Sequence, residues 1–93
     1  MNPDARGSVD TLLGCEVVLD TAGPMVYLGR LVSCDPEGFW LEDADVHSTR
    51  EGHATREQYI AEARRDGIRV NRRRVLVFRG TVTSVSALHD VTD

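Results

Sequence analysis

The stretch MVYLGRLVSCD, residues 25–35, is the part of the sequence that most limits the folds open to this chain. Its apolar residues indicate one long strand, and Gly29 near its centre predicts a sharp bend or a close approach of another backbone. Four more apolar runs bounded by turn residues indicate strands, at residues 15–21, 39–47, 68–78 and 81–88. In a chain of 93 residues, these strands predict a small, strongly curved antiparallel sheet or a partly open barrel.

A short helix is expected before the first strand. Val9, Leu12 and Leu13 recur at helical spacing. Ser8 is a candidate N-cap and Gly14 a candidate stop. A helix of about two turns is too short to be stable alone, so it must lie on an apolar surface.

A second helix is predicted to interrupt the series of strands. The segment ATREQYIAEARRDG, residues 54–67, is rich in helix formers. Thr55 and Gln58 form a capping-box pattern, and Gly67 marks the C-terminal stop. Its apolar stripe is narrow and consists of Tyr59, Ile60 and Ala63. We therefore expect a mostly solvated helix over residues 54–66, outside the barrel and between the third and fourth strands.

The charged residues are distributed unevenly. Eleven arginines, no lysines and 15 acids give a net charge of −4, which argues weakly against a general nucleic-acid coat. Residues 1–63 carry four arginines and twelve acids, whereas residues 64–79 carry seven arginines and one acid. One basic segment therefore lies on an acidic body.

The cysteines and the apolar runs bear on the cellular compartment. Cys15 and Cys34 both lie in apolar strand-like runs, which favours buried free thiols in a reducing cytosol over a disulfide. The first residues lack the apolar stretch of a signal peptide, and no run approaches the roughly 18 residues of a membrane span. We expect a soluble, cytoplasmic protein.

Two motifs resemble the two signatures of the Sm and Sm-like (LSm) family. The first signature, in YLGRLVSCDPEGFWLEDA, has a glycine, a leucine two residues on and an aspartate six residues on, which here are Gly29, Leu31 and Asp35. The second, in VFRGTVTSV, has an apolar residue, Arg-Gly and two further apolar residues, which here are Phe78, Arg79, Gly80, Val82 and Val85. The order and spacing of the two motifs together carry the resemblance.

The resemblance implies a mainly β fold, an Sm-like five-stranded, strongly bent antiparallel barrel. It implies one domain over residues 8–88, with a short N-terminal helix and a helical insertion at about 50–68, between strands 3 and 4. The ends, 1–7 and 89–93, are expected to be flexible. Because the fourth and fifth strands of such a sheet have open edges, the resemblance also implies a homo-oligomeric ring, a hexamer or heptamer, in which copies pair through those edges.

The resemblance also suggests why Arg79 lies where it does. Arg79 follows residues 75–78, which we expect to be buried on both strand faces, where an unpaired charge is costly. In Sm-like proteins the Arg-Gly pair forms the turn between the last two strands and faces the pore of the ring, where the arginine contacts RNA. The resemblance therefore implies single-stranded RNA as a partner of Arg79 and Gly80, with Asp35 in support.

The turn after Asp35 departs from the family pattern. The family's base-reading asparagine would fall on Gly38 or Phe39, and Glu37 places an acid near the expected phosphate path. These departures, the acidic net charge and the amphipathic insertion helix support an alternative function, a structural or protein-interaction ring that has lost RNA recognition. In a purely structural role, the Asp35 carboxylate would pair with Arg79 across the barrel end.

The arginines at residues 72–74 allow two interpretations. Arg72 and Arg74 fall on one strand face and Arg73 on the other. They can supply diffuse charge to RNA, or they can pair with acids of the preceding strand, namely Glu42, Asp43 and Asp45. We favour the ion pairs, because such pairs are common at protein surfaces.

No pattern indicates catalysis or a cofactor. Asp43, Asp45 and His47 alternate along one strand and could converge on a metal ion, but we interpret them as a solvated strand end, with His53 in the following loop. Phe39 and Trp40 must point to opposite faces, so one is core and the other is exposed or covered by a neighbouring copy. The spacings of a catalytic triad, a carboxylate pair or a phosphate loop are missing, so we expect no enzyme and no cofactor.

Overall fold

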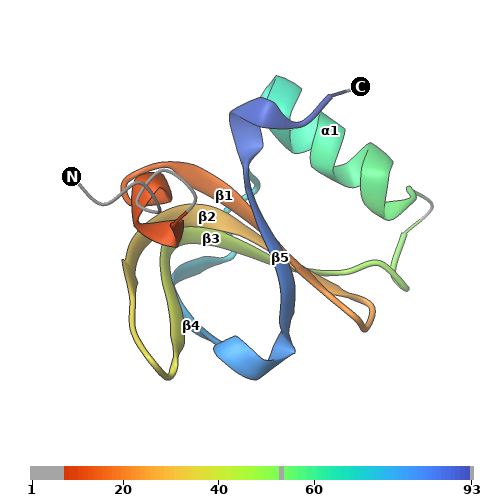
Figure 1. The fold of residues 1–93 in the computed structure, drawn as a ribbon. Coiled ribbons are helices and arrows are strands. Elements are labelled where there is room, and N and C mark those ends of the chain that lie inside the picture. The colour runs from red at the N-terminus through yellow and green to blue at the C-terminus, as the bar shows by residue number, and fades with distance from the viewer. Residues whose placement is uncertain (1–7, 53, 93) are drawn as a thin grey trace.

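The computed structural model describes residues 8–52 and 54–92. Five antiparallel strands form one strongly bent sheet in the order β4-β3-β2-β1-β5 (Figure 1). The strands are β1 (Glu16–Thr21), β2 (Met25–Cys34), β3 (Gly38–Ser48), β4 (Arg72–Phe78) and β5 (Val82–Ala87). The predicted five-stranded, strongly bent antiparallel sheet is confirmed. The expected flexible lead, residues 1–7, lies outside the described residues, as do His53 and Asp93.

The bend lies at Gly29, as the sequence indicates. The pairing of β2 with β3 shifts register between Leu28 and Arg30. A Cβ at Gly29 would lie 3.1 Å from both Cα and Cβ of Ala44, so the two backbones approach closely. Asp43, next to this contact, adopts a positive φ of 50°. The glycine therefore allows both the bend and the close approach.

The barrel interior is an aliphatic core with one aromatic ring. Its buried members are Val17, Leu19, Leu31, Phe39, Leu41, Ala44 and Val77. The expectation that Val75–Phe78 is buried on both faces is wrong, because Val77 is buried whereas Phe78 is 63% exposed. The reason is topological, since β4 is an edge strand with no second layer over its outer face.

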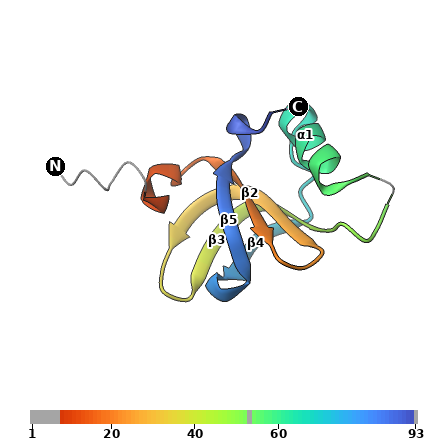
Figure 2. The same cartoon turned by 45° about the vertical axis from the view of Figure 1, so that its right-hand side comes forward.

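Strand β1 is buried on both faces, because the inserted helix covers its outer side. Helix α1 (Arg56–Asp66) begins at the predicted capping box and ends at Gly67, which has a φ of 97°. Its buried residues join a second core on the outside of the sheet, which consists of Val18, Val26, Leu28, Ile60, Ala63 and Leu88. The helix lies outside the barrel as expected and packs by the predicted narrow edge, since only Ile60 and Ala63 of its residues are buried, and that edge covers the second core. Figure 2 shows α1 beside the C-terminal turn, away from the link between β4 and β5.

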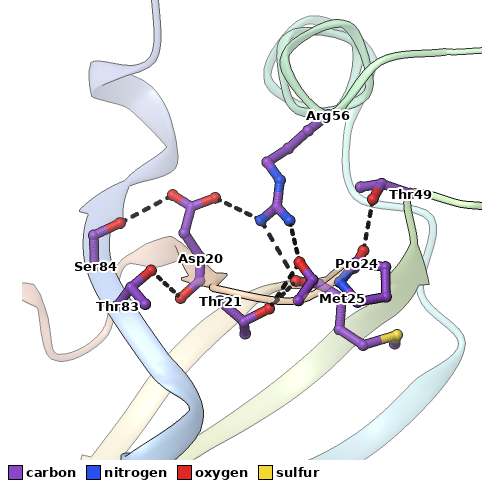
Figure 3. Close-up of polar contacts among 9 residues, drawn as sticks. Asp20, Thr21, Pro24, Met25, Thr49, Arg56, Thr83 and Ser84 are labelled. Atoms are coloured by element: carbon purple, nitrogen blue, oxygen red, sulfur yellow. Dashed lines mark hydrogen bonds and ion pairs between the residues drawn. The ribbon is translucent and has the colours of Figure 1, made fainter.

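Arg56 fastens the beginning of α1 to the sheet. Its Nη1 donates to Asp20 Oδ1 of β1 at 3.1 Å, and its Nη2 donates to the carbonyl of Gly23 in the β1–β2 hairpin at 2.6 Å. The other carboxylate oxygen of Asp20 accepts from Ser84 Oγ of β5 at 3.1 Å (Figure 3). One carboxylate therefore joins the inserted helix, the first strand and the last strand.

The two ends of the described chain form short turns. The predicted first helix is a single 3-10 turn, η2 (Val9–Leu12), with Ser8 Oγ accepting from the backbone N–H of Asp10 as its cap. Leu13 is 43% exposed, because the turn ends before it can pack on the barrel. At the other end, η4 (Leu88–Asp90) contributes buried Leu88 to the outer core, so the expected end segment, 89–93, begins inside a packed turn. Among the described residues, no helix has the length and apolar character needed to cross a membrane.

Candidate functional site

Two turns from distant parts of the sequence meet at one end of the barrel. The β2–β3 turn spans residues 35–37, and η3 (Arg79–Thr81) links β4 to β5. Nη2 of Arg79 donates to the backbone carbonyl of Asp35 at 2.9 Å and to Sγ of Cys34 at 3.2 Å. The backbone N–H of Arg79 donates to the carbonyl of Glu37 at 2.9 Å. The structure therefore brings together Arg79 and Asp35, the residues that the sequence singled out.

The carboxylate of Asp35 holds its own turn. Its Oδ1 accepts from the backbone N–H of Glu37 at 2.8 Å and from that of Gly38 at 3.1 Å. The backbones of Asp35 and Gly38 also exchange two hydrogen bonds, of 3.0 and 3.2 Å. The expected pairing of the Asp35 carboxylate with Arg79 is wrong, because the guanidinium contacts the Asp35 carbonyl while the turn uses the carboxylate. This leaves the positive charge of Arg79 without a carboxylate partner among the described residues.

Gly38 and Phe39, the other candidate residues of this turn, lie inside the structure. A Cβ at Gly38 would lie 2.1 Å from the carbonyl oxygen of Val77, so only glycine fits against β4 there. The ring of Phe39 is 6% exposed and packs in the barrel core. The guanidinium carbon of Arg79 lies 5.5 Å from the centre of that ring. Phe39 therefore lies between Arg79 and the barrel core, and Gly38 packs against the backbone of β4. Neither residue presents a polar side chain to the surface.

Gly80 is exposed and faces open space. A Cβ at this position would meet no atom within 4 Å, and its φ is not positive. A 3-10 turn with ordinary backbone angles makes the link between β4 and β5 at this position. The open space leaves the Gly80 backbone accessible to a ligand.

Shallow grooves flank Arg79 and Gly80. The first is lined by Val9, Asp10, Cys34, Asp35, Pro36 and Arg79. The second runs between the β1–β2 hairpin and η3, and its lining includes Tyr27, Gly80, Thr81 and Thr83. The first groove places a partly buried free thiol, Cys34, beside the guanidinium. No sequence pattern pairs Cys34 with Arg79, since 45 positions separate them.

The strand end that could have held a metal ion is a helix-docking site. Asp45 is 2% exposed and accepts hydrogen bonds from the Tyr59 hydroxyl and, at 2.9 Å, from Asn71 Nδ2. The ring of His47 stacks on Tyr59 with 3.6 Å between centroids. Burial and, next, the hydrogen bond to Asp45 raise the pKa of Tyr59 to about 12. No cluster of His, Cys, Asp or Glu within residues 8–52 and 54–92 is arranged to hold a metal ion.

Comparison with known proteins bears on the fold. No family model and no curated protein sequence matches the chain. Among solved structures, the chain is similar to the Sm protein of Pyrococcus abyssii in complex with a uridine heptamer, with a TM-score of 0.60 and 16% identity over 94% of this chain and 99% of that one. The chain has an Sm-like fold.

The two signatures of the sequence occupy their expected places in this Sm-like fold. Gly29 lies at the bend of β2, and Asp35 holds the turn that follows it. Arg79 and Gly80 form the link between the last two strands. Since β4 and β5 are the two edges of the sheet, both edges remain unpaired in a single chain.

Proposed function

We propose that this chain assembles into a ring of identical copies and binds single-stranded RNA at the barrel end where Arg79 and Gly80 lie. The Sm-like fold supports the proposal, because the similar Pyrococcus protein is an Sm protein complexed with a uridine heptamer. The open edges of β4 and β5 support it as well. Pairing the β4 edge of one copy with the β5 edge of the next removes both edges once the ring closes, with a hexamer or heptamer as the family expectation.

The placement of Arg79 is the observation that carries the proposal. Its side chain is exposed, and it is held in position by two hydrogen bonds from a single nitrogen, Nη2. Within the described residues, no other guanidinium nitrogen of Arg79 donates a hydrogen bond. A guanidinium fixed in this way can stack on a base and donate to a phosphate at the same time. The open space over Gly80 lets a nucleotide approach the adjoining backbone.

The same geometry suggests a mode of binding with little base selectivity. The turn next to Arg79 carries no asparagine, and its polar side chains are those of Asp35 and Glu37. The Asp35 carboxylate is engaged by two backbone N–H groups. Stacking and charge, which tolerate any base, then provide the affinity. We therefore expect uridine and adenine strands to bind with similar affinity.

The test is the affinity of Arg79→Ala for a short oligo-uridine strand, measured together with the mass of the assembly. Stacking on a side chain contributes about 1–3 kcal/mol per base, so loss of Arg79 in every copy should bring binding below detection while the ring persists. Arg50→Ala removes one exposed arginine from the turn after β3 and serves as the matched control.

Three results would count against the proposal. Unchanged affinity of Arg79→Ala would place RNA elsewhere on the molecule. Dissociation of the ring by the same change would make Arg79 an interface residue. A parent protein that forms rings but carries no nuclease-sensitive absorbance at 260 nm and binds no strand would favour the structural ring.

A further inference from the structure

The three consecutive arginines of β4 lack the partners that the sequence suggested for them. Arg72, Arg73 and Arg74 are exposed. Glu42 lies opposite Arg74 in the register of β3 and β4, but its carboxylate pairs with Arg30 of β2 at 2.8 Å.

The other two acids of that stretch of β3 are engaged as well. Asp43 pairs with Arg30 at 3.3 Å, and Asp45 is buried under α1 against Tyr59 and Asn71. The expectation that these acids neutralise the β4 arginines is therefore wrong. All three carboxylates have other partners, since Arg30 pairs with Glu42 and Asp43, and Tyr59 and Asn71 donate to Asp45.

Within the described part of the chain, no carboxylate lies within ion-pair distance of the three arginines. Among the described residues, the one side-chain hydrogen bond of these three arginines goes from Arg72 Nη1 to the carbonyl of Asn71, at 3.0 Å. Arg72 and Arg74 lie two residues apart on one face and repel each other, and within the described chain no carboxylate at ion-pair distance offsets that repulsion. A row of this kind on a protein with a net charge of −4 is a surface suited to an anionic partner.

Trp40 holds the side chain of Arg74 against the outer face of the sheet. The guanidinium carbon of Arg74 lies 4.5 Å from the centre of the Trp40 ring. Trp40 pairs with Leu76 across the strands, so it is a diagonal neighbour of Arg74 on one face of the sheet. A cation over the ring face is attracted by it, and a guanidinium held there can still donate two N–H groups to a phosphate. Tryptophan and arginine together also provide a surface on which a base can stack.

We propose that Arg72 and Arg74, which share the outer face of β4 with Trp40, form a second RNA contact that binds the phosphate backbone of an RNA strand running outside the pore. The proposal rests on the proposed function in taking RNA as the partner. β4 leads directly into Arg79 (Figure 1). A single RNA strand can therefore run along β4 from these arginines to the proposed pore site at Arg79. Alternate residues of a strand are about 6.6 Å apart, which suits successive phosphates of an extended nucleic acid.

The experiment compares two triple variants with two RNA lengths. One variant replaces Arg72, Arg73 and Arg74 by serine. The control variant replaces three exposed arginines elsewhere, Arg50, Arg64 and Arg65, and so changes the net charge equally. RNA affinity is measured as a function of salt concentration with two RNAs. A uridine heptamer is expected to reach the pore site only, and an unstructured RNA several times longer is expected to reach both sites.

The expected result is specific to the row and to the longer strand. Each phosphate contact with a single strand contributes about 0.7 to the slope of log affinity against log salt, so the β4 variant should lose about 1.4 units of slope on the long RNA through Arg72 and Arg74. It should bind the heptamer as the parent does, and the control variant should keep most of its slope on both. The long RNA should also change the emission of Trp40, the sole tryptophan, whereas the heptamer should not. Arg74→Lys, which keeps the charge but not the planar stack, should lose most of that change.

The outcomes separate this proposal from the pore proposal. If Arg79→Ala leaves heptamer binding intact while the β4 variant weakens the long RNA, the pore function fails and the outer contact stands. An unchanged slope for the β4 variant overturns the outer contact, as does a parent that binds no RNA. Displacement of the long RNA by poly-glutamate at equal charge concentration would identify an acidic protein as the partner instead. A changed assembly mass in the β4 variant would assign the row to the contact between copies.

Discussion

Gly38 and Gly80 stand at the same end of the barrel, and the structure predicts opposite outcomes when each is changed to alanine. A Cβ at Gly38 would begin 2.1 Å from the carbonyl oxygen of Val77, whereas ordinary contact requires at least 3.4 Å. It would also lie 3.1 Å from the backbone nitrogen of Arg79. Because these neighbours are backbone atoms, relief requires β3 and β4 to separate where Gly38 pairs with Phe78.

The cost follows from that separation. Overpacking of this kind costs about 1–3 kcal/mol. Separation also weakens the hydrogen bond from the Arg79 N–H to Glu37 and those that close the Asp35 turn, each worth about 0.5–1.5 kcal/mol. We expect Gly38→Ala to lower the free energy of unfolding by about 2–5 kcal/mol, a large part of the stability of a small domain.

Gly80→Ala should be neutral or slightly stabilising. The added methyl group meets no atom within 4 Å, and the backbone angles suit any residue. Less freedom in the unfolded chain then contributes about 0.4–1 kcal/mol in favour of the folded state. The two variants differ by one methyl group each, so the comparison isolates the local geometry.

The assay is urea denaturation followed by Trp40 emission, at one protein concentration because assembly adds to apparent stability. Ordinary substitutions lower the free energy of unfolding by roughly 1 kcal/mol. A Gly38→Ala protein whose free energy of unfolding is within about 0.5 kcal/mol of the parent's would therefore refute the tight approach of β3 to β4. A Gly80→Ala protein that loses more than about 1 kcal/mol would refute the open turn. RNA affinity adds a second measurement, since a stable Gly80→Ala ring that binds RNA more weakly would indicate that a nucleotide approaches this backbone.

Two further predictions concern the inserted helix. The pKa of Tyr59 is 10.0 unfolded and about 12 folded, so its contribution to stability is complete below pH 10 and is lost as the pH rises through 12. The stability advantage of the parent over Tyr59→Phe should shrink across that window in denaturation curves, and an advantage that stays constant would contradict the raised pKa. Arg56→Ala should lower the free energy of unfolding by about 1.5–3 kcal/mol through lost charge-assisted hydrogen bonds, whereas Arg64→Ala, with one 3.4 Å contact, should change it by less than about 0.5. Equal losses in both would mean that the Arg56 network does not fasten the helix.

The sequence predicted those parts of the fold that depend on local chemistry. Gly29 indicated the bend because a strand interior rarely contains glycine without a reason, and the bend and the close approach are both present. Thr55 and Gln58 indicated the beginning of α1 because their hydrogen bonds are made within four residues. At the site, Arg79 and Asp35 were recognised from two short motifs, and the structure brings the two turns together.

The sequence could not indicate which partner each polar group finds across the sheet. An aspartate and an arginine can form an ion pair, but the Asp35 carboxylate accepts hydrogen bonds from the backbone of its own turn instead. The docking of Asp45 with Asn71 joins residues 26 positions apart, and no spacing rule relates them. Burial depends on the same distant contacts, since Phe78 is exposed because no layer covers the outer face of β4, whereas α1 folds back over the outer face of β1.

The partners of the β3 carboxylates also affect how copies of the chain can pair. Arg30 and the docked helix engage the acids of β3, so β4 keeps three exposed arginines at its open edge. The other open edge, β5, reads VTSVSA and carries no charge. Two copies joined through β4 would set arginines against arginines, which is unfavourable, whereas β4 against β5 places them opposite neutral residues. The unlike edges therefore favour a head-to-tail contact, the kind that can close into a ring, and this contact leaves Arg72 and Arg74 on the outer face of β4, where we propose that RNA binds.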